Sequence, residues 1–196
     1  MKGLYGQDMM ISIGKMYDYL GMILDLSVRG QLTVTMVEYL KWITSNFRSW
    51  KHSLGSSHHH LRRTSMLLER KSTKRNFDEK RATSFHNAVA QLLFACPREK
   101  NNIQTAVYFL TTRVRIPDEY NWGKLKRILR YVRRTINMTL IIRVDILAVT
   151  KWWVGASYMA HLYMRGHRGA TISLGRGPVN GISKKHRINT KSSTEA

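Results

Sequence analysis

Cysteine is almost absent from this chain of 196 residues, which contains only Cys96. One cysteine cannot form an internal disulfide, and this composition is typical of a reducing compartment. Long hydrophobic runs are also absent, because Arg143, Asp145 and Lys151 interrupt the best candidate for a membrane span, which needs about 18 apolar residues. The N-terminus lacks the apolar run of a signal peptide. These absences predict an intracellular protein, cytoplasmic or nuclear, with no membrane partner.

Acidic residues are the third scarcity, with 12 Asp and Glu against 33 Lys and Arg. No two aspartates are adjacent anywhere, and Glu195 is the sole acidic residue from Lys151 to the end. Two-metal phosphodiester cleavage needs clustered carboxylates around ions about 4 Å apart, so this last segment lacks the ligands. The net charge of +21 instead favours polyanions through counterion release, with steeply salt-dependent binding. A drifted, poorly soluble chain would have the same composition.

Hydrophobic residues, in contrast, make up 43% of the chain and include five tryptophans and nine tyrosines. This content is typical of a globular protein with a core, and the length allows one or two domains. The first predicted element is a β-hairpin over residues 17–34, with one strand up to Leu26 and a turn at 28–30. Thr35 and Glu38 match a capping box, which predicts a short helix starting at Met36.

Residues 46–82 differ in composition from the rest and are rich in Ser, His, Arg and Lys. Little apolar periodicity remains there, which predicts a basic linker of low complexity. Three adjacent histidines, residues 58–60, could in principle bind a metal. Adjacent side chains do not converge on one ion, and no Cys or carboxylate is near, so no metal site is predicted.

Three helices are predicted after this linker. Residues 84–94 carry an apolar stripe of Phe85, Ala88, Val89, Leu92 and Leu93, and Pro97 ends it. A second helix, capped by Asn102, points Ile103, Ala106, Val107 and Leu110 inward and ends near Arg115. The third spans residues 118–134, with acidic residues at its N-terminus and arginines at its C-terminus, as the helix dipole favours.

The third helix is the best candidate for a nucleic-acid contact. Its predicted buried face consists of Trp122, Leu125, Ile128, Leu129 and Val132. The predicted nucleic-acid-binding residues cover much of the remainder and are Lys124, Lys126, Arg127, Arg130, Arg133 and Arg134. Basic side chains on an exposed face neutralise phosphates without reading sequence. A solvated charged face is an equally good explanation of the same pattern.

Four strands are predicted in the last third of the chain, at residues 138–144, 152–158, 169–174 and 179–188. Glycine turns such as residues 175–177 separate them. Together with the hairpin and the helices they make an α+β fold.

Four segments carry a resemblance to a known family. They are Tyr-Leu-Gly at 19–21, Gln-Leu-Leu-Phe at 91–94, Lys-Trp-Trp-Val-Gly-Ala-Ser-Tyr at 151–158 and Asn-Thr-Lys-Ser-Ser-Thr-Glu-Ala at 189–196. In this order and spacing they resemble the Pol polyprotein of copia-type LTR retrotransposons, from the C-terminal part of reverse transcriptase to the start of RNase H. The resemblance covers most of the chain outside residues 46–81.

The resemblance implies that Tyr19, Leu20 and Gly21 belong to a primer grip, the hairpin that holds the growing strand. It also implies four parts: the end of the reverse transcriptase palm with its primer-grip hairpin and first thumb helix (1–45), the linker (46–82), the helical thumb and connection region (83–136), and a truncated RNase H-like domain (137–196). The strands of that last part would be the antiparallel portion of a mixed sheet. Without its covering helix, such a sheet exposes an apolar face and an open edge.

The parent polyprotein would synthesise DNA on RNA and cleave the RNA strand, using Mg²⁺. This chain lacks the polymerase Asp-Asp box, and Gly155 stands where the RNase H family has its first catalytic aspartate. We therefore expect an inactive remnant with no catalytic residue, metal site or cofactor. Its expected partners are RNA, DNA or an RNA–DNA hybrid, bound weakly and salt-dependently, and other Pol fragments. The alternatives are a basic, non-enzymatic nucleic-acid-binding protein and a translation product that never folds stably.

Overall fold

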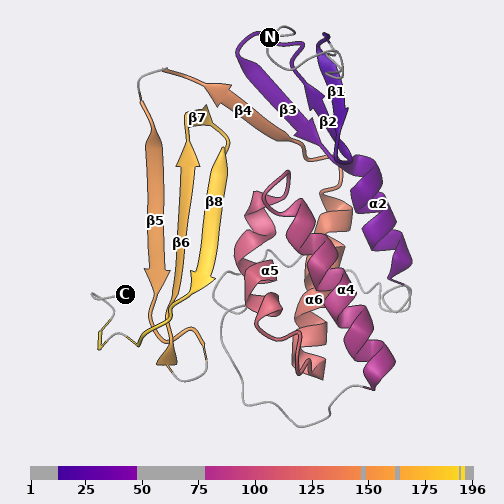
Figure 1. The fold of residues 1–196 in the computed structure, drawn as a ribbon, viewed down its shortest axis with the longest axis vertical. Helices are drawn as coiled ribbons and strands as arrows, with labels where there is room; N and C mark the ends of the chain where they lie inside the picture. Colours follow the sequence, from indigo (N-terminus) through magenta and orange to yellow (C-terminus); the bar gives the residue numbers. More distant parts are fainter. Residues whose placement is uncertain (1–12, 48–77, 147–148, 162–163, 190, 193–196) are drawn as a thin grey trace, which may run out of the picture.

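The computed structural model describes residues 13–47, 78–146, 149–161, 164–189 and 191–192. A cluster of helices lies beside two antiparallel sheets, so the predicted α+β class is confirmed (Figure 1). Most of the predicted linker 46–82, with the three histidines at 58–60, lies outside the described residues, as does Glu195. Among the described residues, no helix combines the length and apolar character that crossing a bilayer requires.

The first sheet joins segments from both ends of the chain. In spatial order its strands are β1 (Met16–Tyr19), β2 (Met22–Asp25), β3 (Gln31–Thr35), β4 (Leu140–Val144) and β7 (Gly175–Arg176). Each neighbouring pair is antiparallel, and Val34 of β3 lies opposite Leu140 of β4. A continuous sheet therefore crosses the boundary predicted at residue 137.

The single strand predicted from Tyr17 to Leu26 is wrong. The chain reverses at Leu20 and Gly21, whose φ angles are 52° and 72°. Two consecutive positive φ angles are typical of the tight turn that joins twisted antiparallel strands, and glycine adopts them without steric cost. Tyr-Leu-Gly is thus the turn of a β1–β2 hairpin, and residues 28–30 make a second turn before β3.

Within the described residues, four α-helices and one short 3₁₀ helix form the helical cluster. They are α2 (Val37–Asn46), α4 (Glu79–Ala95), the 3₁₀ helix η2 (Asn101–Ile103), α5 (Gln104–Thr111) and α6 (Glu119–Arg134). The third predicted helix is confirmed, and Asp118 caps it by accepting a hydrogen bond from the Asn121 backbone N–H at 2.7 Å. All five apolar residues predicted for its inner face are buried.

Several predicted boundaries and caps are wrong. Thr35 belongs to β3, so the capping box does not form and α2 starts at Val37. Helix α4 starts five residues before Ser84, and its Leu93 is half-buried. Asn102 lies inside η2 instead of capping a helix, and α5 ends at Thr111, before Arg115. Of these ends, the start of α2 has a partner distant in the sequence, Glu99.

Two adjacent charged residues in the α4–η2 loop connect three elements. Glu99 accepts a hydrogen bond from the Met36 backbone N–H at 2.7 Å. It therefore caps the N-terminus of α2, where the sequence predicted a capping box. The fully buried Lys100 donates to the carbonyls of Thr135 and Met138, at 2.7 and 2.8 Å, where α6 leads into β4. The Lys100 ammonium and the Glu99 carboxylate also form an ion pair, with Nζ 3.5 Å from Oε1. Together the two residues therefore hold β3 and β4 against the helices.

The second sheet consists of β5 (Lys151–Ser157), β6 (His167–Ser173) and β8 (Asn180–Lys185), in that spatial order. The strands predicted at 152–158, 169–174 and 179–188 are these three, while the strand at 138–144 joins the first sheet as β4. The Gln104 side chain donates to the Gly181 carbonyl at 2.8 Å and attaches α5 to β8. One face of this sheet consequently lies toward η2 and α5 (Figure 1).

Candidate nucleic-acid interface

Helix α6 presents one basic face. At 100° per residue, Lys126, Arg127, Arg130, Arg133 and Arg134 fall within an arc of roughly 120°, on the side away from the buried residues. Arg127, Arg133 and Arg134 are exposed, and the other two are half-buried. The structure thus brings five of the six predicted basic residues together on one surface.

Lys124 is the exception, and its predicted place on the exposed face is wrong. Only 5% of the residue is exposed, and its Nζ lies 4.1 Å from the ring centroid of Phe109 and 4.4 Å from that of Tyr120. On the helix it lies outside the basic arc, one turn before Ile128. Burial, followed by the positive charge of Arg113, lowers the Lys124 pKa to about 8. Its ammonium contacts aromatic rings, a favourable arrangement in a desolvated position.

The predicted primer-grip residues lie at the tip of the β1–β2 hairpin. Tyr19 and Leu20 are both 58% exposed, and Gly21 completes the turn. Met22, the next residue, packs against the helical core. The turn is therefore held close to the helices with two apolar side chains open to solvent, and its contact with a primer stays a prediction.

Strand β5 carries two neighbouring tryptophans that point to opposite sides of the second sheet. Side chains alternate along a strand, so Trp153, Gly155 and Ser157 share one face, and Trp152 shares the other with Val154. Across the sheet, Trp153 lies opposite Thr171 and Gly155 opposite Gly169. A Cβ added at Gly155 would meet nothing within 4 Å, so the paired glycines leave a hollow in this face.

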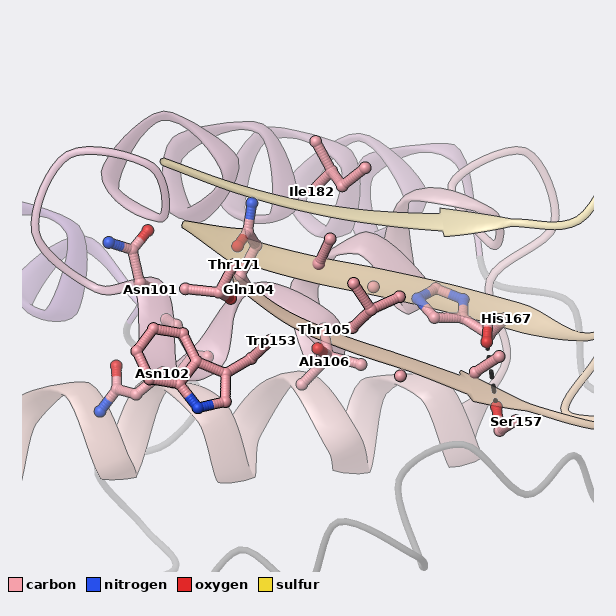
Figure 2. A pocket seen from close by; sticks show the side chains of 16 residues that line it. Asn101, Asn102, Gln104, Thr105, Ala106, Trp153, Ser157, His167, Thr171 and Ile182 are labelled. Carbon is pink, nitrogen blue, oxygen red and sulfur yellow. Dashed lines mark hydrogen bonds between the residues drawn. The ribbon is translucent and has the colours of Figure 1, made fainter. Parts of the chain in front are cut away.

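The hollow is part of a pocket of about 460 Å³ between this face and the residues of η2 and α5. Three amide side chains line it, those of Asn101, Asn102 and Gln104, together with the Trp153 indole (Figure 2). The lining contains no Asp, Glu, Lys or Arg. We did not predict this pocket from the sequence. A glycine inside a strand indicates a place where the sheet has no side chain, and two predicted strands contain one. That Gly155 lies opposite Gly169 depends on how the two strands pair, which the sequence does not give.

The pocket adjoins the basic face of α6. Asn102, in its wall, donates a hydrogen bond from Nδ2 to the Tyr131 hydroxyl at 2.6 Å. Tyr131 lies four residues after Arg127 and three before Arg134, spacings that make both arginines its neighbours on the helix surface. The wall of the pocket therefore contacts Tyr131, which lies beside the edge of the basic arc.

A buried chain of polar groups lies behind the pocket. His167 is hydrogen-bonded through Nδ1 to His161 Nε2 at 2.9 Å and through Nε2 to Ser183 Oγ at 2.6 Å. The His161 ring also stacks on Phe109, with centroids 5.3 Å apart. Burial and then the neighbouring His167 lower the pKa of His161 to about 3, and burial with His186 lowers that of His167.

Both histidines are therefore neutral at neutral pH, and the pocket wall carries no charge from them. Ser183 is only 2% exposed. A serine hydrogen-bonded to a histidine can be a nucleophile where substrate reaches it, but this hydroxyl is closed off. These three side chains form an interior network in which the buried Nδ1 of His161 has no hydrogen-bond partner.

The residues around Gly155 do not fit the Mg²⁺ pair of an RNase H centre. Hard divalent cations need oxygen ligands, mainly carboxylates, and Gly155 has no side chain. The pocket lining contains no carboxylate, and the described part of the chain holds no group of three or more His, Cys, Asp or Glu side chains placed to bind a metal ion. No metal-dependent step can be derived from this site.

Comparison of the chain with protein-family models, with curated proteins and with solved structures gave no match in any of the three. A relationship to copia-type Pol polyproteins therefore stays a prediction from the sequence motifs.

Proposed function

We propose that this protein binds nucleic acid without catalysis, through the basic face of α6, and that it is a remnant of a copia-type retrotransposon Pol polyprotein. The observation that carries the binding proposal is the arc of Lys126, Arg127, Arg130, Arg133 and Arg134 on one surface of a helix whose opposite side is firmly buried. A rigid helix holds these charges at fixed spacing, so several phosphates can be contacted at once.

Two features of the fold support the retrotransposon origin. The Tyr-Leu-Gly motif forms the turn of an exposed hairpin next to the first helix, as a primer grip requires. Strands β5, β6 and β8 are antiparallel neighbours, as expected for the opening strands of an RNase H domain, and the two-residue β7 between β6 and β8 pairs with β4 of the first sheet. By the sequence resemblance, Gly155 would take the position of the first catalytic aspartate, which is what a remnant without chemistry requires.

The test compares charge removal on α6 with equal charge removal elsewhere. In the triple variant Arg127→Ala, Arg133→Ala, Arg134→Ala, the slope of log K against log salt should become less negative by about 2 to 3, because each cation that leaves a phosphate removes about one unit. Fluorescence anisotropy with a labelled RNA, single-stranded DNA and RNA–DNA hybrid over a salt series measures this slope.

A matched control removes three exposed basic residues from the second sheet and its C-terminal flank, Arg168, Lys184 and Arg187. Its net charge equals that of the α6 variant, so the two differ only in where the charges were. Equal loss in both variants, or binding by the parent protein that persists unchanged at high salt, would contradict the α6 assignment.

A further inference from the structure

We infer that the pocket between η2, α5 and the second sheet is a site for one unpaired nucleobase of a single-stranded RNA or DNA. The phosphates of that strand lie along the basic face of α6. This inference rests on the proposed nucleic-acid binding and adds a ligand group and a place for it.

The chemistry of the lining fits a neutral, flat, polar group. The Trp153 indole, 54% exposed, stands near one end of the pocket beside Asn102, and His167 stands near the other (Figure 2). Aromatic side chains stack on bases of any sequence. Side-chain amides both donate and accept, so Asn101 and Asn102 match the mixed donors and acceptors of a base edge.

The size and the open floor also fit. A volume of about 460 Å³ lies within the range of small-ligand sites. The floor is open because Gly155 lies opposite Gly169, and neither has a side chain to fill the space. A flat ring stacked at Trp153 can therefore extend over these two glycines.

A phosphate is a poor occupant of the same pocket. The lining has no Lys or Arg, and His167 uses both ring nitrogens in hydrogen bonds with His161 and Ser183. A buried anion without a cation or several donors is unfavourable. The cations stand outside, on α6, connected to the pocket wall by the Asn102–Tyr131 hydrogen bond. This geometry favours a base inside the pocket and the phosphates outside it, on the basic face of α6.

The adjacent tryptophans give a matched test. Trp153→Ala removes the indole in the pocket, and Trp152→Ala removes an indole of 65% exposure from the opposite face of the same strand. The probes are a short single-stranded DNA and an abasic strand of equal length, which carries the same phosphates and no bases. We expect Trp153→Ala to weaken binding of the normal strand about tenfold, within the range of one stacked base, and to leave the abasic strand unchanged. Trp152→Ala should change neither.

A second variant closes the pocket without removing an aromatic ring. Gly155→Leu places its side chain in open space, and β5 has no positive φ at this position, so the fold should tolerate it. We expect the same loss for the normal strand as in Trp153→Ala, with an unchanged melting temperature. Thermal unfolding of every variant identifies any that fails to fold, and Trp153→Ala carries the test if Gly155→Leu is such a variant.

The outcomes separate this inference from the proposed function. If Trp153→Ala and Gly155→Leu leave the preference for the normal strand unchanged while the α6 triple variant loses salt-dependent binding, the pocket assignment is overturned and the proposed function stands. If Trp152→Ala alone abolishes the preference, the opposite face of the sheet stacks the bases, and the pocket assignment is also overturned. A parent protein that binds no strand at low salt overturns both.

Discussion

Single residues in this protein show how burial changes the role of a side chain. Lys124 and Lys126 are two positions apart on α6, yet Lys124 is enclosed by Phe109 and Tyr120 while Lys126 reaches the basic face. His161 and His167 are likewise enclosed and neutral, although the molecule around them is strongly positive. The net charge counted in the sequence includes the enclosed Lys124 and therefore overstates the charge available to a ligand.

His161 makes the stability of the fold dependent on pH. Its pKa in the folded state, about 3, is below the ordinary histidine value, so the unfolded chain binds more protons between about pH 6.5 and 3. Stability should be fully present above pH 6.5 and fall as the pH drops through this window, by at most about 1.4 kcal/mol per pH unit for this one group.

Urea unfolding at several pH values measures this dependence. His161→Phe keeps a ring against Phe109 and removes the titrating group, so its unfolding free energy should vary less with pH than that of the parent protein. His167, whose pKa is also lowered, adds to the slope in both proteins. A slope as steep in the variant as in the parent would contradict the role given to His161.

At the scale of elements, contacts between distant segments decide where helices begin and strands pair. Helix α2 has no side-chain hydrogen bond from its own N-cap residue, Met36. Instead, the Met36 backbone N–H donates to the carboxylate of Glu99, 63 residues later in the chain. Lys100 next to it satisfies the carbonyls between α6 and β4. Burial raises the pKa of Glu99 and lowers that of Lys100, and each charge counters the shift of the other. Glu99 and Lys100 thus connect the end of β3 and the start of β4 to the same loop.

Removing the cation of this pair should destabilise the protein strongly. Lys100→Met leaves Glu99 as an uncompensated buried charge and two carbonyls without a donor, at a cost of about 3 to 5 kcal/mol. Chemical denaturation measures the loss. The control Lys41→Met removes a lysine whose partner Glu38 is on the surface, and it should cost less than about 1 kcal/mol. Equal costs for the two substitutions would show that the buried pair does not hold these elements together.

At the scale of the whole molecule, the described residues cover the second sheet on one side only. Trp152, Val154 and Ile182, on the face away from the helices, are 65%, 79% and 46% exposed. In this part of the chain the apolar face predicted for a sheet without its covering helix is therefore present, and among the strands that the structure describes β5 pairs only with β6. Aggregation through this face and edge stays a prediction.

The whole molecule should also fail to cleave an RNA–DNA hybrid in the presence of Mg²⁺. Gly155 and the carboxylate-free lining around it supply no ligand for the ions that this reaction uses. A labelled hybrid incubated with purified protein and separated on a gel measures cleavage. Activity that disappears in a Glu195→Gln variant would contradict the prediction, whereas activity that survives this change would indicate a contaminating nuclease.

The sequence by itself determined the elements whose information is local. The inner face of α6, the acidic residues at its N-terminus and the positions of β5, β6 and β8 follow from periodicity, the helix dipole and turn residues, because these depend on neighbours within a few positions. Only the tertiary structure decided the pairing of β3 with β4, the burial of Lys124 and the pocket under Trp153. Each of these joins residues far apart in the chain, and hydrophobic and electrostatic energies depend on distance in space, which local pattern does not contain.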